Sequence, residues 1–228
     1  MNTLWMMFWV VTAGWAGDAR IVCFGDSTTA PREGVVPYCE QIRAVGRETV
    51  NRGVRGNTTE HGRERFAADV LAVKPDVVIL QFGINDSTVD VWKSPPAKSA
   101  RVTVARFREN LTYFVESLKS AGARVVLMTF NPLAWTEKMT AMYGKAPYQP
   151  GEPMGFNAGR EPYLQAIREV ARQQGVVLVD VDAAFREYAA TAGQSLNDLL
   201  LDGIHPNTRG HEVVARLLSA RGVLPPTR

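Results

Sequence analysis

Three histidines, His61, His205 and His211, are the only imidazole side chains in the 228 residues, so a histidine general base must be one of them. A serine hydroxyl becomes a nucleophile when such a base removes its proton and a third group orients the base. Asp202 lies three residues before His205, with Gly203 between them. A carboxylate at that spacing can reach back to the imidazole Nδ1 and leave Nε2 free, so this pair predicts a general base with its orienting acid.

Ser27 is the predicted nucleophile, because it follows the first predicted strand in a loop that begins at Gly25. Hydrolysis through a tetrahedral intermediate also needs donors aimed at the oxyanion, and one such donor contributes about 3–4 kcal/mol. The backbone N–H of Gly56, the side-chain amide of Asn85 and the backbone N–H of Ser27 are suited to this role. These residues predict ester hydrolysis by a serine.

The elements that must position these residues are short β-rich runs alternating with longer runs of helical spacing, a pattern typical of a parallel sheet covered on both faces. The predicted strands are 20–24, 49–51, 76–82, 124–130 and 176–181. The predicted helices are 38–45, 60–73, 100–120, 161–174, 182–191 and 208–220. Ligands bind outside the carboxyl ends of such strands, which is where the predicted nucleophile and oxyanion donors fall.

Four blocks of residues, in this order, resemble the SGNH hydrolases, also called the GDSL family of esterases and lipases. They are the Gly-Asp-Ser of residues 25–27, the glycine of residues 56–58, the Gly-x-Asn-Asp of residues 83–86 and the Asp-x-x-His of residues 202–205. The resemblance spans residue 20 to about residue 220. It implies an α/β fold, a flavodoxin-like three-layer α/β/α sandwich with a five-stranded parallel sheet.

The resemblance also implies the role of each site residue. Ser27 is the nucleophile, His205 the base and Asp202 its orienting acid, with Gly56 and Asn85 as oxyanion donors. Gly56 is preferred to Gly53, a turn residue, because the family's donor glycine precedes a polar residue and a Ser or Thr at a helix start. The Gly-x-Ser-x-Gly motif of the α/β-hydrolases is absent from the sequence.

Other polar residues near these motifs are predicted to be structural. Asp26 and Asp86 are expected to hold loops by accepting backbone hydrogen bonds. His61 lies on a charged, solvated helix face, and His211 is structural or exposed at the start of the last helix. Residues 180 and 182 lack metal-ligand spacing, so neither a metal site nor a cofactor is expected.

Composition and charge indicate one ordinary globular domain. The chain has 26 Lys and Arg against 23 Asp and Glu, a formal charge of +3, and 46% apolar residues. No run of Lys or Arg marks a nucleic-acid partner. We therefore expect a single SGNH hydrolase domain over residues 17–228, large enough to bury a hydrophobic core without stabilisation by disulfides or a bound metal. The oligomeric state is left open.

The N-terminal residues predict export. An apolar block at residues 4–11 is followed by small residues that include Gly14 and Ala16. The block is too short to span a bilayer, which needs about 18–20 residues, so residues 1–16 are predicted to be a signal peptide cleaved after Ala16. An uncleaved anchor or a misassigned start is the alternative. The expected location is secreted or periplasmic, with no stable membrane partner after cleavage.

Two cysteines fall in the first predicted strand and the following helix, Cys23 and Cys39. They could pair in an oxidising compartment. Since cysteine is among the residues most often buried, two separate buried side chains are the favoured interpretation.

Residues 131–160 contain four prolines and several aromatic residues, and no short strand-to-helix connection needs such a length. Long irregular loops in compact domains are usually binding loops or lids. Trp135, Tyr143 and Tyr148 are therefore candidate substrate-binding residues. The alternative, of equal weight, is that these rings and Phe156 pack the loop onto the body of the domain.

The predicted function is that of a secreted serine esterase that forms an acyl-serine intermediate and removes O-acetyl groups from a carbohydrate. Its partner would be an acylated small molecule or polysaccharide. A lysophospholipase or thioesterase acting on longer acyl chains is one alternative. A non-catalytic carbohydrate-binding module that retains the fold is another.

Overall fold

A computed structural model of the chain describes residues 19–44 and 48–223. Five parallel strands form one sheet in the order β2-β1-β3-β4-β5. Their bounds are β1 Arg20–Gly25, β2 Glu48–Gly53, β3 Val77–Gln81, β4 Arg124–Met128 and β5 Val177–Val179. The predicted three-layer sandwich with a five-stranded parallel sheet is confirmed. The predicted signal segment, residues 1–16, lies outside the described residues and stays a prediction.

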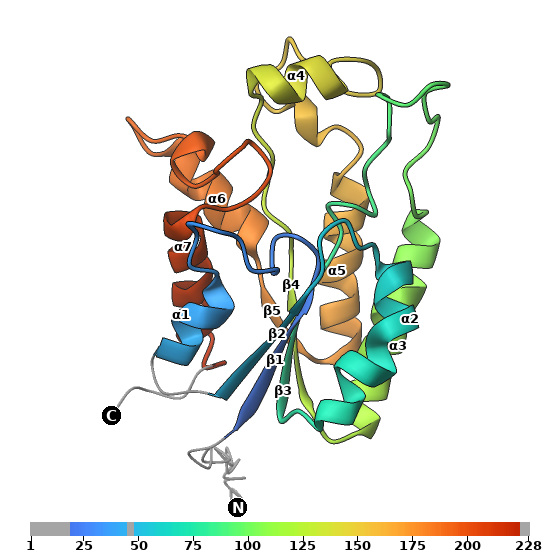
Figure 1. The fold of residues 1–228 in the computed structure, drawn as a ribbon, viewed down its shortest axis with the longest axis vertical. Helices are drawn as coiled ribbons and strands as arrows, with labels where there is room; N and C mark the ends of the chain where they lie inside the picture. The colour runs from blue at the N-terminus through green and yellow to red at the C-terminus, as the bar shows by residue number, and fades with distance from the viewer. Residues whose placement is uncertain (1–18, 45–47, 224–228) are drawn as a thin grey trace, which may run out of the picture.

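Helices cover both faces of this sheet (Figure 1). One face carries α2 (Thr59–Asp69), α3 (Val104–Ser120) and α5 (Glu161–Gln174), and the other carries α1 (Tyr38–Ala44), α6 (Val181–Ala190) and α7 (Thr208–Ala220). Single turns of 3-10 helix lie at Leu71–Val73 (η1), Gly155–Asn157 (η2) and Leu196–Asp198 (η3). All five residues of β3 are buried, as a strand covered on both faces requires.

The larger of the two cores is aromatic and lies between the sheet and the layer of α2, α3 and α5. Phe24 of β1 lies at its centre, with its ring centroid 5.2 Å from that of Phe82 and 5.8 Å from those of Phe66 and Phe114. These rings meet mostly edge to face or tilted, the arrangement that aromatic quadrupoles favour. Because the side chains at the end of β1 pack in this core, the position at which the loop that carries Ser27 begins is fixed.

Local capping sets where the helices begin. The predicted helix 100–120 starts only at Val104, because the Thr103 side chain accepts a hydrogen bond from the Arg106 N–H and caps α3. Asn207 caps α7 in the same way through the N–H of Gly210, 3.0 Å away. The predicted bounds of α5 and α7 are confirmed.

Cys23 and Cys39 form a disulfide, so the expectation of two separate buried side chains is wrong. Helix α1 packs on the face of the sheet toward which Cys23 of β1 points, and both residues belong to the same buried cluster. Their Cα atoms are 6.2 Å apart, within the range that a disulfide spans. Sequence spacing could not show this, because the pairing depends on how the helix crosses the strand.

Residues 131–160 form an ordered lobe above the carboxyl ends of the strands (Figure 1). The lobe contains α4 (Glu137–Tyr143), which the sequence analysis did not predict, and η2. Tyr143, Tyr148 and Phe156 are buried, and Trp135 stacks on Phe156 with ring centroids 4.6 Å apart. The packing interpretation therefore holds for these rings.

The hydroxyl group of Tyr148 both accepts and donates a hydrogen bond, which fixes the position of the ring. The hydroxyl accepts a hydrogen bond from Val89 N over 2.9 Å and donates one to Val89 O. Tyr148 is 3% exposed and Tyr143 8% exposed, so the expectation that both present their rings to substrate is corrected. Trp135, which keeps intermediate exposure, remains a candidate.

Arg160 ties the lobe to the loop after β3. Its buried guanidinium donates to Ile84 O over 3.1 Å and to Ser87 Oγ over 2.7 Å.

Within the described part of the chain, no helix is long and apolar enough to cross a membrane.

Candidate active site

Ser27, His205 and Asp202 come from distant parts of the chain and form one hydrogen-bonded line. His205 Nε2 lies 2.9 Å from Ser27 Oγ. His205 Nδ1 lies 2.8 Å from Asp202 Oδ2 and 3.0 Å from Oδ1. A carboxylate at Nδ1 holds the proton on that nitrogen, so Nε2 is left to accept the serine proton. The structure thus brings the three sequence-predicted residues together in the order that serine hydrolysis requires.

The turn between Asp202 and His205 depends on Gly203. Its φ is +84°, and a Cβ at this position would lie 2.5 Å from the carbonyl oxygen of Ala134. Asp202 Oδ1 accepts from the N–H groups of Ile204 (3.1 Å) and His205 (2.9 Å). The same carboxylate therefore holds both the backbone turn and the imidazole ring.

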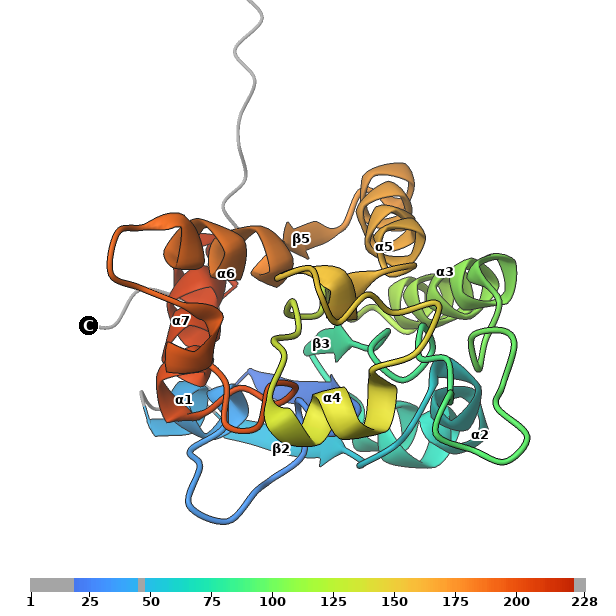
Figure 2. The same cartoon turned by 90° about the horizontal axis from the view of Figure 1, so that it is seen from above.

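Residues that follow β4 hold this turn against the sheet. Ala134 N donates to Gly203 O over 2.8 Å, and Asn131 Nδ2 donates to Ile204 O over 2.9 Å. Figure 2, which looks down on the strand ends, shows the loop before α7 beside the loop after β1. The first residues of the 131–160 lobe thus position the loop that carries Asp202 and His205.

Burial raises the pKa of Asp202, but the hydrogen bonds from the ring and backbone of His205 more than offset it. The pKa of this carboxyl therefore lies well below its usual range. A carboxylate that stays ionised at every pH of interest can stabilise the imidazolium that forms when His205 takes a proton.

Gly56 and Asn85, the predicted oxyanion donors, lie in the loops that follow β2 and β3, and a hydrogen bond from Asn85 to Asn57 joins these loops. Asn85 Nδ2 donates to the carbonyl of Asn57 over 3.1 Å, and the same side chain lies near the buried carboxyl of Asp26. Gly56 has a φ of +77°, and the space where a Cβ would stand is open. A backbone N–H there can be approached closely.

Arg101 is a residue of this site that the sequence analysis missed. Its Nη1 donates to Asn85 Oδ1 over 2.9 Å, while Nε and Nη2 bind the carboxylate of Asp90, at 3.1 and 2.7 Å for the shortest contacts. Lys93 binds the same carboxylate at 2.8 Å. Since the amide oxygen of Asn85 faces Arg101, its amide nitrogen is turned toward Asn57, the residue after Gly56.

Two buried carboxylates support the loops beneath the site, as predicted. Asp26 Oδ1 accepts from Thr28 N and Oγ1, both at 2.8 Å. Asp86 Oδ1 accepts from Thr59 N at 2.8 Å, at the first turn of α2. Burial raises the pKa of Asp26, and it raises the pKa of Asp86 to about 7.

Neither of the other histidines contacts the triad by a hydrogen bond that the structure shows. His61 Nδ1 accepts from Thr58 N over 3.1 Å and closes the start of α2, a more specific role than the solvated one predicted. His211 is 4% exposed and its ring faces that of Tyr38, with centroids 6.0 Å apart. It is structural, one of the two predicted possibilities.

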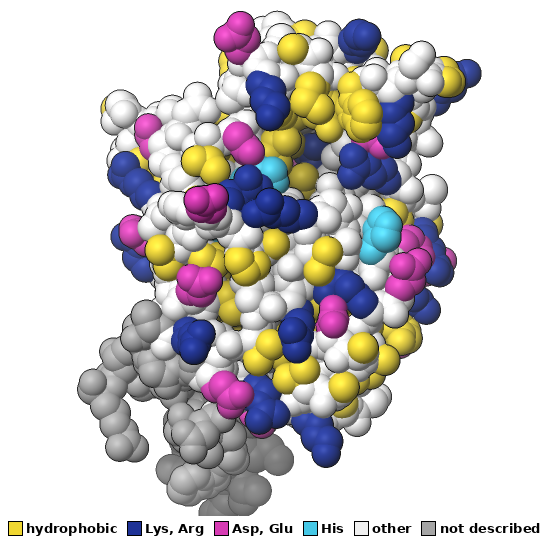
Figure 3. Space-filling view, viewed as in Figure 1, with side chains coloured by type: hydrophobic (Ala, Val, Ile, Leu, Met, Phe, Trp, Pro, Cys, Tyr) yellow, Lys and Arg dark blue, Asp and Glu magenta, His cyan; other side chains and the backbone are white. Residues whose placement is uncertain are grey.

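A hollow of about 430 Å³ opens beside Gly56. Its lining is mostly polar or charged, and its apolar members are Trp92 and Val102. Figure 3 shows that Lys and Arg side chains are interspersed with Asp and Glu side chains on this face of the molecule.

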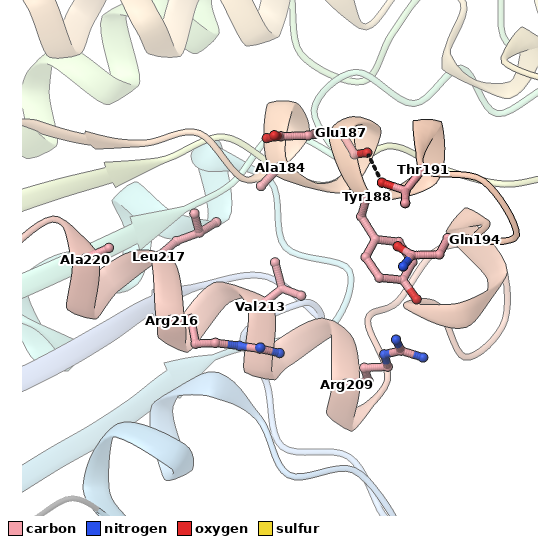
Figure 4. A pocket seen from close by; sticks show the side chains of 10 residues that line it. All are labelled: Ala184, Glu187, Tyr188, Thr191, Gln194, Arg209, Val213, Arg216, Leu217 and Ala220. Carbon is pink, nitrogen blue, oxygen red and sulfur yellow. Dashed lines mark hydrogen bonds between the residues drawn. The ribbon is translucent and has the colours of Figure 1, made fainter.

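A second hollow, of about 460 Å³, lies between α6 and α7 (Figure 4). Arg209 lies over the ring of Tyr188 at its polar end, and Val213 and Leu217 line its apolar side. None of the predicted site residues lines it.

Among residues 19–44 and 48–223, no three His, Cys, Asp or Glu side chains gather in a way that could hold a metal ion.

Residues 23–213 match the model of the GDSL-like lipase/acylhydrolase family. The chain is similar to an uncharacterized lipoprotein of Bacillus subtilis (strain 168), with 31% identity over 226 residues that cover 90% of each chain. It is also similar to an acetylxylan esterase of Geobacillus stearothermophilus, with 29% identity over 175 residues, 75% of this chain and 70% of the relative.

A crystal structure of an acetylxylan esterase from Geobacillus stearothermophilus superimposes with a TM-score of 0.70 at 25% sequence identity, covering 90% of this chain and 94% of that one. Structures described as catalytic mutants of that esterase carry alanine in place of a serine, an aspartate or a histidine. The aspartate and the histidine are three residues apart in that chain.

Proposed function

The chain belongs to the GDSL-like lipase/acylhydrolase family and is a carboxylic ester hydrolase, and from this premise we propose that it removes O-acetyl groups from a carbohydrate through an acetyl-serine intermediate on Ser27. The observation that carries the proposal is the hydrogen-bonded line from Ser27 Oγ through His205 to Asp202. The same three residue types are those changed in the catalytic mutants of the similar esterase, with the same spacing of aspartate and histidine.

The first half of the proposed reaction forms the acetyl-enzyme. Ser27 Oγ attacks the ester carbonyl carbon as its proton passes to His205 Nε2. The carbonyl oxygen becomes an oxyanion that accepts from the N–H groups of Ser27 and Gly56 and from Asn85 Nδ2. As the tetrahedral intermediate collapses, the bond to the sugar oxygen breaks and that oxygen takes the proton from Nε2.

The second half repeats the chemistry with water. His205 Nε2 takes a proton from a water molecule, whose oxygen attacks the acetyl carbon. The intermediate collapses with cleavage of the bond to Ser27 Oγ, which regains the proton, and acetic acid leaves. Asp202 remains ionised throughout and stabilises the imidazolium in both halves.

A carbohydrate leaving group is favoured by the lining of the hollow beside Gly56. Thr58, Glu60 and His61 are among its lining residues, and these groups suit sugar hydroxyls better than an alkyl chain. The acetylxylan esterases among the similar proteins support the same substrate class. Export is supported by the predicted signal segment and by the similar lipoprotein.

Replacement of Ser27 by alanine tests the nucleophile. Hydrolysis of p-nitrophenyl acetate by S27A is expected to fall by at least about 10⁴-fold. Ser219→Ala, which changes an exposed serine of α7, is the matched control and is expected to retain the wild-type rate. Wild-type activity in S27A would overturn the assignment.

Acyl-chain length separates the proposal from a lysophospholipase or thioesterase. The wild-type protein is expected to hydrolyse p-nitrophenyl acetate with a higher kcat/KM than the octanoate. It is also expected to release acetate from acetylated xylo-oligosaccharides. A preference for octanoate would exclude the acetylesterase, and a wild-type protein without esterase activity would favour the non-catalytic binding module.

A further inference from the structure

We propose that Trp92 is the stacking platform of a sugar-binding subsite in the hollow beside the oxyanion donors. This inference rests on the proposed carbohydrate esterase function and adds the residue that would recognise a sugar ring next to the reacting ester. Trp92 has no role in the reaction steps above, and the sequence motifs do not include it.

The position and exposure of Trp92 are the first observations. Trp92 and Gly56 line the same hollow, so a molecule bound against the indole would lie next to the oxyanion site. Trp92 is 48% exposed, and its side chain is the largest among the exposed apolar residues of the described chain. An exposed aromatic ring in a concave site is the usual mark of a ligand contact rather than of packing.

The indole is also held in place. Trp92 lies beside Tyr143 at the end of α4: burial raises the pKa of the Tyr143 hydroxyl, and the Trp92 side chain offsets part of that rise. Lys93 Nζ lies over the indole ring, 5.6 Å from its centroid. Tyr143 is fixed in turn by edge-to-face contact with Tyr148, with ring centroids 5.6 Å apart. A ring that is already positioned loses little side-chain entropy when a ligand binds. The buried Tyr143 therefore supports the platform instead of contacting substrate itself.

The charges around the indole indicate a neutral occupant. Two cations, Lys93 and Arg101, and two carboxylates, Asp90 and Glu60, line the hollow. Asp90 binds both cations, and Glu60 binds Arg106 outside it. Since Asp90 pairs with both Lys93 and Arg101, neither cation is left unpaired to attract a phosphate or a carboxylate. A neutral sugar, with one apolar ring face and a rim of hydroxyls, would stack on the indole face that is turned away from Lys93, whose Nζ lies over the ring.

The test compares two substrates in the same variants. The measured quantity is the ratio of kcat/KM for acetylated xylo-oligosaccharides to kcat/KM for p-nitrophenyl acetate, because only the first substrate can occupy a sugar subsite. In Trp92→Ala this ratio is expected to fall about tenfold, mainly through KM, as for loss of a buried aromatic contact at a binding site. Trp92→Phe is expected to retain most of it.

Tyr113→Ala is the matched control, since it removes an exposed aromatic ring of α3 outside the hollow, and its ratio is expected to stay at the wild-type value. Trp92→Leu, which keeps an apolar side chain, replaces the alanine variant if thermal unfolding shows that the latter does not fold. A ratio in Trp92→Ala or Trp92→Leu that equals the wild-type ratio, including one that results from equal losses on both substrates, would overturn the subsite. Absence of p-nitrophenyl acetate hydrolysis in the wild type would instead overturn the esterase mechanism.

Discussion

Arg101 donates a hydrogen bond to the amide oxygen of Asn85 over 2.9 Å, and this contact leaves the amide nitrogen as the end that is turned away from Arg101. A free asparagine side chain could turn its oxygen toward the oxyanion, which would repel it. Arg101 cannot turn away, because buried Asp90 holds its other nitrogens. The orientation of a donor in the proposed oxyanion hole thus depends on a residue that need not contact substrate.

Arg101→Met is therefore expected to lower kcat for p-nitrophenyl acetate about tenfold with little change in KM. The loss should be smaller than the roughly 10²–10³-fold effect of deleting an oxyanion donor, because the amide remains and only its orientation is free. Arg101→Lys should restore part of the rate. In an Asn85→Ala background the Arg101 change should add little, since the group it orients is gone.

Lys93→Met is the control for this prediction, because Lys93 binds the same Asp90 carboxylate without contacting Asn85. Its kcat for p-nitrophenyl acetate is expected to stay within about twofold of wild type. Equal losses in the Lys93 and Arg101 variants would show that the Asp90 cluster acts on the fold and not on the amide.

Asp202→Asn is expected to reduce kcat by about 10²–10⁴-fold while the protein stays folded. The asparagine oxygen can still accept from the N–H groups of Ile204 and His205, but its amide group would offer a donor to His205 Nδ1. An amide donor at Nδ1 favours the imidazole tautomer that carries its proton on Nε2. In that tautomer Nε2 cannot accept the proton of Ser27. Steady-state kinetics with circular dichroism as the folding check would measure this, and near wild-type turnover would contradict the orienting role.

The motifs predicted the fold and the triad because their constraints are local. A parallel strand buried on both faces is continuously apolar, as β3 is, and residues that follow such strands must meet at one edge of the sheet. Asp202 and His205 are three residues apart, so their pairing needs only a turn that Gly203 permits.

The features that the sequence did not predict depend on contacts between distant segments of the chain. The Cys23–Cys39 disulfide requires α1 to cross β1 at one place, and the contact of Arg101 with Asn85 requires the 82–103 segment to fold back on itself. The aromatic residues of the 131–160 lobe could equally have faced a ligand or one another. Only the burial of Tyr143 and Tyr148 decided between these alternatives.

The disulfide gives a prediction about stability. Cys23 and Cys39 are 16 residues apart, and a crosslink that closes a loop of about that length contributes about 3 kcal/mol to the free energy of unfolding. The Cys23→Ala/Cys39→Ala variant is expected to lose stability of that order in urea unfolding. Both sulfur atoms lie in buried residues, so dithiothreitol should reduce the wild type only after unfolding. Two free thiols in the native, unreduced protein would contradict the pairing.

His211 makes stability depend on pH in a defined window. Burial, followed by the nearby charges of Arg32 and His205, lowers the pKa of His211 to about 4, and its Nδ1 has no hydrogen-bond partner in the structure. An unfolded histidine titrates near 6.5, so between about pH 6.5 and 4 the unfolded state binds a proton that the folded state does not. This group therefore contributes stability that is fully present above about pH 6.5 and is lost as the pH falls toward 4.

His211→Leu, similar in volume and without a titrating group, removes that contribution, so the difference in unfolding free energy between wild type and variant should shift by roughly 2–3 kcal/mol from pH 7.5 to pH 4. Urea unfolding at closely spaced pH values measures it, and because other groups titrate in both proteins, the difference isolates His211. Two curves that remain parallel across the window would mean that the histidine is protonated without cost in the folded state, which its 4% exposure beside the ring of Tyr38 argues against.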